Sequence, residues 1–268
     1  PWPAACWASL WKRMLLQAPQ CRRPMINSQL NTSPLPVVGS GSGWIVVEKP
    51  SGMSVHNDPG KDLCARLNHY FQSRPAAAEA IAYDHTYGLN PVHRLDKETS
   101  GMMLLSCRRE VFDQLTRQFA QGLVTKRYLA LVHGNMDASD TWRLWQWPLT
   151  PKAAGRRNPK GRGRRAPCQT HYRLVLKSRH YSLIECRLDT GRTHQIRRHA
   201  VLAGHPVTGD TRYGSLRACR YLEKNHGFTR LGLHAASLTI QPPDAGAPQC
   251  FASERLPTEI QRLLDSDS

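Results

Sequence analysis

The chain has 268 residues, of which 40% are hydrophobic and 21% are charged, proportions that are ordinary for a globular protein with its own hydrophobic core. Its charge balance is unusual, because 37 Lys and Arg face 20 Asp and Glu and leave a formal net charge of +17. Such an excess indicates a polyanionic partner. Since the sequence has no basic amphipathic helix and no apolar run that could span a bilayer, nucleic acid is favoured over an anionic membrane.

The eight cysteines are scattered and form no C-x-x-C pair, a pattern typical of reduced thiols in an intracellular protein. They are Cys6, Cys21, Cys64, Cys107, Cys168, Cys186, Cys219 and Cys250. His194 and His199 lie five residues apart on a predicted helix and so face different sides, with no carboxylate to complete a ligand set. The sequence therefore predicts no metal site.

Residues 1–43 contain no acidic residue and become rich in Pro, Ser and Gly. This composition predicts a flexible extension, followed by one folded domain over residues 44–268. Residues 7–15 could form a short amphipathic helix of the kind found in organelle transit peptides. Translated upstream sequence ahead of a start at Met25 explains the segment as well and is the interpretation we favour, so we expect a cytoplasmic protein, with a mitochondrial one as the alternative.

Apolar periodicity predicts the remaining elements. Helices are expected near residues 64–71, over 109–121, where Gly122 follows the predicted end, and over 257–264 after a proline. Strands are expected at 44–47, 126–134, 168–177, 180–188 and 231–240. Tyr128 lies on the second of these strands and is by default a core residue. Strands that alternate cleanly, with few helices, predict an α+β fold around a mixed, mostly antiparallel sheet.

Residues 91–107, PVHRLDKETSGMMLLSC, place charged and small polar residues between two apolar runs. If residues 91–95 are extended and residues 102–107 form a buried strand, Asp96 sits on a short loop held at both ends by sheet. The same residues are also typical of a plain turn in which Asp96 accepts hydrogen bonds from backbone amides. This stretch alone does not decide between the two.

Residues 152–165, KAAGRRNPKGRGRR, carry seven basic residues and no acid. The composition predicts a mobile loop, which is either a solvated segment or an arm that neutralises phosphates. The overall charge favours the arm, without sequence readout of its own. Its RNA-binding candidates are Lys152, Arg156, Arg157, Lys160, Arg162, Arg164 and Arg165.

Residues 189–199, DTGRTHQIRRH, predict a turn followed by a helix, with Thr193 as N-cap and Ile196 on the apolar face. Arg197 lies next to that buried edge. Because burying an unpaired charge is costly, Arg197 is expected to have an anionic partner.

Four motifs in this order resemble the RluA family of pseudouridine synthases: EKPSGMSVH at 48–56, HRLDKETSG at 93–101, KRYLALVHG at 126–134 and GRTHQIRRH at 191–199. GDTRYG at 209–214 and LHA at 233–235 match as well. The resemblance covers about residues 44–240. Each motif alone is weak, whereas the ordered set is specific.

The resemblance implies a pseudouridine synthase fold with a central catalytic cleft, acting on specific uridines of tRNA or rRNA without cofactor or metal. It implies that Asp96 is the catalytic carboxylate and that Arg197 pairs with it. Tyr128 would stack on the target uracil, Ile196 would close the other side of the base, and Arg94 would enter the space left by the flipped nucleotide. His93, Arg192 and His194 join the substrate-binding candidates. We expect a monomer.

Three other readings compete. A noncatalytic RNA-binding or ribosome-assembly protein would explain the charge but not the set of Asp96, Tyr128 and Arg197. A glycosidase or nuclease would need a second carboxylate or a metal cluster, neither of which is visible. The HRLD and DTG strings lack the context of a kinase catalytic loop or of an aspartic protease.

Overall fold

The computed structural model describes residues 28–137 and 141–267. The chain forms two compact units, which we name after one residue of each. The Asp96 unit contains residues 28–126 and Ala235–Glu254, and the Arg197 unit contains Arg127–His234 and residues 255–267. The chain passes from one unit to the other within β5 (Thr125–His133) and at the start of β9 (Leu233–Ile240).

The sheet of the Asp96 unit has the strand order β1-β2-β4-β9, with β3 on β4 and β10 on β9. These strands are β1 (Val37–Gly41), β2 (Trp44–Lys49), β3 (Asn90–Pro91), β4 (Ser100–Ser106) and β10 (Gln249–Ala252). β2 and β4 pair antiparallel from Trp44 with Ser106 to Lys49 with Gly101. Every residue of β4 is buried, as predicted for the strand that follows Asp96.

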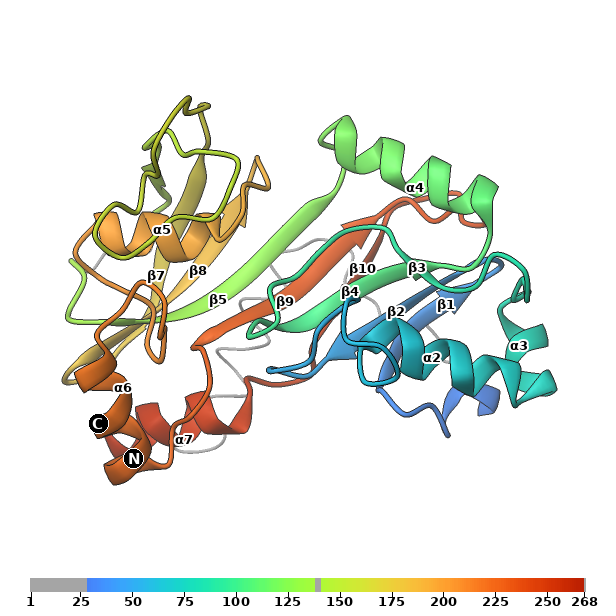
Figure 1. Ribbon diagram of the computed structural model, residues 1–268, viewed down its shortest axis with the longest axis horizontal. Helices are drawn as coiled ribbons and strands as arrows, with labels where there is room; N and C mark the ends of the chain where they lie inside the picture. Colours follow the sequence, from blue (N-terminus) through green and yellow to red (C-terminus); the bar gives the residue numbers. More distant parts are fainter. Residues whose placement is uncertain (1–27, 138–140, 268) are drawn as a thin grey trace. The chain divides into compact units, whose positions relative to one another are not determined.

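Helices cover both faces of this sheet (Figure 1). Val46 and Leu104 pack with Leu115 of α4 (Arg109–Ala120) in one hydrophobic cluster. Their strand neighbours Ile45 and Leu105 point to the opposite face, and both are fully buried. That face is covered by α2 (Leu63–Gln72) and α3 (Pro75–Ala80). Asp62 caps α2 by accepting the backbone N–H of Ala65 at 2.8 Å.

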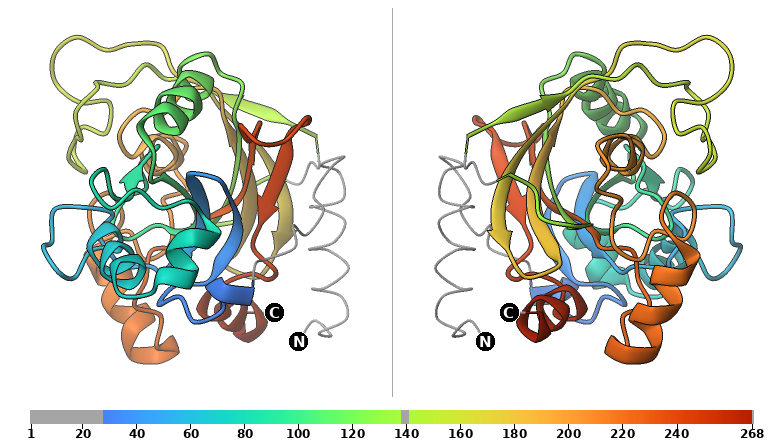
Figure 2. Two further views of the ribbon diagram at one scale, coloured as in Figure 1. Left: turned by 90° about the vertical axis from the view of Figure 1, so that its right-hand side faces the viewer. Right: turned by 90° about the vertical axis from the view of Figure 1, so that its left-hand side faces the viewer.

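The sheet of the Arg197 unit has the order β5-β8-β7-β6. It contains β6 (Arg143–Trp145), β7 (Thr170–Lys177) and β8 (Tyr181–Leu188), and each printed pairing is antiparallel. α5 (Gln195–Leu202) packs against β7, and α6 (Leu216–His226) and α7 (Thr258–Ser266) complete the unit. Figure 2 shows the long segment between β6 and β7, coloured yellow-green, as a loop that projects from the sheet.

The predicted α+β class with a mostly antiparallel sheet is confirmed, as are the strands at 126–134, 168–177 and 180–188 and the helices at 64–71 and 109–121. The predicted extension over residues 1–43 does not match the structure in its second part. That part contains a 3-10 helix, η1 (Ser28–Leu30), and β1, with Leu30 and Leu35 buried. The transit-peptide and upstream-sequence interpretations concern residues that lie outside the described ranges.

In the described part of the chain, no helix has both the length and the apolar character needed to cross a bilayer. Over the same residues, no group of three or more His, Cys, Asp or Glu side chains could hold a metal ion. Cys64, Cys107, Cys168, Cys186 and Cys219 are free thiols.

Candidate functional site

Asp96 lies on the turn between β3 and β4, and a buried lysine fixes that turn. Lys49, at the end of β2, is fully buried, and its Nζ donates to the carbonyl oxygens of Lys97 at 3.0 Å, Pro50 at 2.9 Å and Met53 at 2.8 Å. Two loops that are distant in sequence are thereby bound to one ammonium group. Because hydrogen bonds to a charged group are stronger than neutral ones, Lys49 makes the Asp96 turn rigid.

Two further bonds join the same loops. Ser51 Oγ donates to the carbonyl oxygen of Glu98 at 2.6 Å, and the Gly52 N–H donates to that of Lys97 at 2.9 Å. At the other end of the turn, Gly101 has φ +115°, and a Cβ there would collide with the carbonyl oxygen of Ala235. Only glycine fits this close approach of β4 to β9. The EKPSG and HRLDKETSG motifs are therefore two halves of one mount for Asp96.

His93 and Arg94 precede Asp96 on the same turn and have different environments. The Nε2 of His93 accepts the Leu104 N–H at 3.0 Å, and its ring stacks on Phe119 at 5.1 Å between centroids. Burial, aided by the charge of Lys126, lowers the pKa of His93 to about 3, so the ring is neutral and bound to the backbone at neutral pH. Arg94 is exposed. Its entry into a nucleic acid and the contact of His93 with substrate stay predictions.

In the Arg197 unit, Arg197 has the anionic partner that the sequence required, and it is Asp210. Arg197 Nε and Nη2 donate to the two carboxylate oxygens of Asp210 at 2.7 and 2.9 Å, and the two side chains are 4% and 0% exposed. Asp210 Oδ1 also accepts the N–H groups of Arg212 and Tyr213 at 2.9 and 3.0 Å. The Asp210 pair uses two of the five N–H donors of a guanidinium, so it does not exclude a second carboxylate on Arg197.

Tyr213 shares the environment of Arg197. Its ring lies 5.3 Å from the Arg197 guanidinium carbon, within cation–π range. Its hydroxyl oxygen is 2.9 Å from Nδ1 of His194 and accepts the Ala154 N–H at 3.3 Å. The GDTRYG motif thus supplies both a carboxylate and an aromatic ring that orient the arginine. Sequence reasoning matched this motif but gave neither residue a role.

The start of α5 differs from the prediction. Thr193 is not the N-cap, because the helix begins after His194, which adopts left-handed φ 54° and ψ 32°. Thr193 Oγ1 instead donates to the carbonyl oxygen of Pro151 at 2.9 Å. The turn is held by Gln195, whose Oε1 accepts from Thr190 Oγ1 and from the N–H of Arg192 at 2.8 and 3.0 Å.

Tyr128 and Ile196 are both nearly buried, at 8% and 3% exposure. Tyr128 lies on β5 opposite Cys186 of β8, on the face of the sheet opposite to its neighbour Arg127. The Nε of Arg192, also a substrate-binding candidate, is buried and has no hydrogen-bond acceptor among the residues that the structure describes. A buried guanidinium nitrogen without an acceptor is costly, which suits a group that meets an anion.

The basic loop is not the unanchored mobile segment that its composition predicted. Arg198 is fully buried behind it and donates to the loop carbonyls of Pro159 at 2.6 Å, Lys160 at 2.8 Å and Lys152 at 3.4 Å, and to that of Thr150 at 2.9 Å. Figure 1 shows the loop lying over α5. Burial lowers the pKa of the Arg198 guanidinium.

The outer side of this loop keeps the predicted basic character. Exposed side chains are those of Lys152, Arg156, Arg157, Arg162, Arg164 and Arg165, whereas Lys160 is half-buried. The loop is therefore a folded support whose main-chain carbonyls face one buried cation and whose cationic side chains face solvent. Composition could not reveal this, since the anchor lies in another segment of the chain.

The structure thus assigns the predicted residues to two groups. Asp96, Arg94 and His93 belong to the Asp96 unit, and Tyr128, Arg192, His194, Ile196 and Arg197 belong to the other, together with the basic loop. The approach of Asp96 to Arg197 and Tyr128 stays a prediction. Lys49, Gln195, Arg198, Asp210 and Tyr213 were missed as residues that position these groups, although each lies in or beside a motif.

Comparison with known proteins adds an independent finding. Residues 43–201 match the family model described as RNA pseudouridylate synthase. The chain is 35% identical over 236 residues to a protein of Zymomonas mobilis named ribosomal large subunit pseudouridine synthase D, covering 86% of this chain and 72% of that one. It is 34% identical over 231 residues to a ribosomal large subunit pseudouridine synthase C of Vibrio vulnificus, covering 83% and 67%.

The fold has counterparts among solved structures. The human protein titled RNA pseudouridylate synthase domain containing 1 matches with a TM-score of 0.66 at 23% identity, over 89% of this chain and 90% of the other. The human domain containing 4 protein matches with a TM-score of 0.64 at 22% identity, over 86% and 92%. These two likenesses concern the fold.

Proposed function

Because the chain belongs to the RluA family of RNA pseudouridine synthases, we propose that Asp96 is the carboxylate that carries out its isomerisation of uridine. The observation that carries this assignment is the mount described above, in which buried Lys49 holds the carbonyls next to Asp96. A plain surface turn needs no such anchor, whereas a reacting group must be held within a fraction of an ångström. Membership of the family favours an enzyme over the noncatalytic RNA-binding alternative.

The reaction requires little besides a positioned carboxylate. The bond from uracil N1 to ribose C1′ breaks, the detached ring turns, and a bond from C5 to C1′ forms; the C5 proton leaves and N1 gains a proton, so the product is an isomer. Asp96 would either attack the sugar carbon or remove a sugar proton, and both routes stay open. No net oxidation or reduction occurs, and no group is transferred to another molecule.

The remaining roles follow the chemistry of each side chain. Arg197 would hold Asp96 ionised and oriented through a paired contact in addition to its bond with Asp210. Tyr128 would stack on the detached uracil, with a phenol able to accept the C5 proton, and Ile196 would close the other face of the base. Arg94 would fill the space that the flipped nucleotide leaves.

Ribosomal RNA is the substrate class that we propose, because the two relatives above carry that substrate in their names. The basic loop and the net charge of +17 support a large, folded RNA. Transfer RNA is the alternative, favoured only by the motif that combines the RRH helix with GDTRYG. The loop supplies phosphate contacts and affinity, and contacts elsewhere would choose the uridine.

The test compares wild type with Asp96→Asn on large-subunit ribosomal RNA and on total tRNA, both prepared from cells that lack this gene. Pseudouridine is mapped in each RNA after single-turnover incubation. We expect new pseudouridine in ribosomal RNA with wild type and at least a hundredfold slower formation with Asp96→Asn at unchanged RNA affinity. Residual activity within tenfold of wild type would remove Asp96 from the role, and new sites confined to tRNA would overturn the substrate assignment.

A further inference from the structure

A second pocket lies in the Arg197 unit, at the end of β5 that is remote from Tyr128. Its volume is about 620 Å³, and the turn between β7 and β8, helix α6 and the end of α7 complete its walls. The lining includes His133, His180, Tyr181, Arg217, Tyr221 and Asp267. This volume lies within the range of pockets that hold small organic groups, roughly 300–1,000 Å³.

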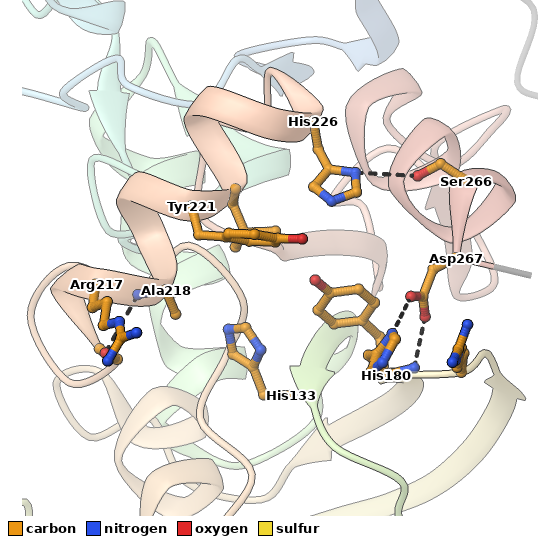
Figure 3. Close-up of a pocket in the computed structure, with 12 residues that line it drawn as sticks. His133, His180, Arg217, Ala218, Tyr221, His226, Ser266 and Asp267 are labelled. Carbon is orange, nitrogen blue, oxygen red and sulfur yellow. Dashed lines mark hydrogen bonds and ion pairs between the residues drawn. The ribbon is translucent and has the colours of Figure 1, made fainter.

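Aromatic rings face each other across this pocket. In Figure 3, Tyr221 and His226 extend from α6 toward His133 and His180 on the opposite wall. Tyr221 is 58% exposed although it is a large aromatic residue. Tyr181 lies on the floor at 6% exposure, with its ring centroid 5.5 Å from that of His133. Two separated aromatic walls that solvent can reach form a slot for a flat ring.

The charge of the pocket selects the kind of ligand. Arg179 and Arg217 are exposed at its edge. The one acidic residue in the lining is Asp267, which accepts hydrogen bonds from Ser178 Oγ at 2.6 Å and from the N–H and Nδ1 of His180 at 2.7 and 2.6 Å. Although burial opposes ionisation, these bonds lower the pKa of Asp267. Its charge is thus committed within the protein, and the edge remains basic.

We propose that this pocket binds an unpaired nucleotide of the RNA substrate, with its base between Tyr221 and the wall of His133 and Tyr181, and its phosphate on Arg217. A base offers the flat face that the slot requires, and a phosphate offers the anion that the edge requires. The proposal deepens the proposed function, because it extends the RNA footprint beyond the target uridine.

The chain connects this pocket to the candidate site. Tyr128 and His133 are five residues apart on β5, a separation of about 17 Å at about 3.4 Å per residue. Such a distance corresponds to about five stacked nucleotides at about 3.4 Å each. The segment that orients Arg197 through Asp210 and Tyr213 also leads directly into Ser215, which lines the pocket and caps α6. One RNA strand can therefore reach both places.

The test uses the full chain and a single-stranded RNA of ribosomal sequence in which 4-thiouridine replaces uridine. Crosslinked peptides are mapped, and affinity is measured by fluorescence anisotropy for Tyr221→Ala, Tyr221→Phe and Arg217→Ala. Leu216→Ala is the matched control, since Leu216 is exposed on the same helix but does not line the pocket. Uridine 5′-monophosphate serves as a competitor that carries the base and phosphate without the strand.

We expect crosslinks to α6 and a loss of affinity of roughly 5- to 150-fold in Tyr221→Ala, the value of one stacked base. Tyr221→Phe and the control should bind as wild type, and Arg217→Ala should lower the salt slope by about 0.7. Unchanged affinity in Tyr221→Ala, or capture of the monophosphate with no effect on RNA, would overturn the proposal. Because these readouts measure binding, they remain informative if Asp96→Asn shows that the proposed chemistry is wrong.

Discussion

The buried pair of Arg197 and Asp210 allows a prediction of known size. Both side chains are almost inaccessible, and the pair is bidentate at 2.7 and 2.9 Å. Removing one partner of such a pair leaves an uncompensated buried charge, which costs about 3–5 kcal/mol. Asp210→Ala should therefore destabilise the Arg197 unit by that amount. For a domain of this size 1 kcal/mol corresponds to about 2–4 °C, so its melting temperature should fall by roughly 6–20 °C.

The assay is thermal unfolding followed by circular dichroism and, in parallel, the single-turnover rate of pseudouridine formation. Asp113→Ala is the control, because Asp113 forms an exposed i,i+4 pair with Arg109 and should contribute at most about 0.5 kcal/mol. The double variant Arg197→Met with Asp210→Leu should recover most of the stability, since an apolar pair of similar volume replaces the charges. It should not recover activity, because the guanidinium is gone.

Two results would refute this reasoning. If Asp210→Ala unfolds within 2 °C of wild type, the pair is not a structural anchor. If the Met and Leu double variant retains activity within tenfold of wild type, Arg197 has no part in the reaction, and its only role is to pack the unit.

Further predictions concern the loop, its anchor and pH. Replacing four exposed loop arginines by glutamine should reduce the salt slope of RNA binding by about 0.7 per lost contact on single strands, and an unchanged slope would exclude the loop from RNA; the four are Arg156, Arg157, Arg162 and Arg164. Arg198→Met should expose the loop to limited proteolysis while the exposed control Arg217→Met leaves it protected. Burial lowers the pKa of His234 to about 3, so its neutral form stabilises the fold fully above the unfolded value near 6.5 and that contribution is lost as pH falls toward 3. Urea unfolding between pH 6.5 and 5 should show stability falling by up to about 1.4 kcal/mol per pH unit for this group, with a shallower slope in His234→Gln.

Local pattern predicted the elements that bury one face and expose another. The alternation in residues 126–134 defines β5 because the side chains of a strand point alternately to the two faces. The burial of β4 followed from its continuous apolar run. The start of α5 could not be predicted in this way. His194 takes a left-handed conformation that few residues other than glycine adopt, and the capping preference of Thr193 does not reveal it.

Contacts between distant segments were beyond local pattern. Composition predicted the ionic character of the basic loop but not its fold, since the stabilising charge is on Arg198, more than thirty residues downstream of much of the loop. The requirement for an anion near Arg197 was predicted correctly from burial. The identity of one such anion, Asp210, was not, because a sequence shows that a buried arginine needs a carboxylate without showing which carboxylate the fold brings to it.

The two consecutive arginines of α5 connect the parts of the Arg197 unit that we assign to chemistry and to RNA affinity. Successive residues on a helix point about 100° apart, so one turn of α5 directs Arg197 to Asp210 and Arg198 to the carbonyls of the basic loop. The position of the loop relative to Arg197 is therefore set by a single rigid element and not by the length of a flexible arm. RNA phosphates bound on the outer side of that loop would then lie in a fixed register with Arg197, which is what an enzyme needs to select one uridine by geometry.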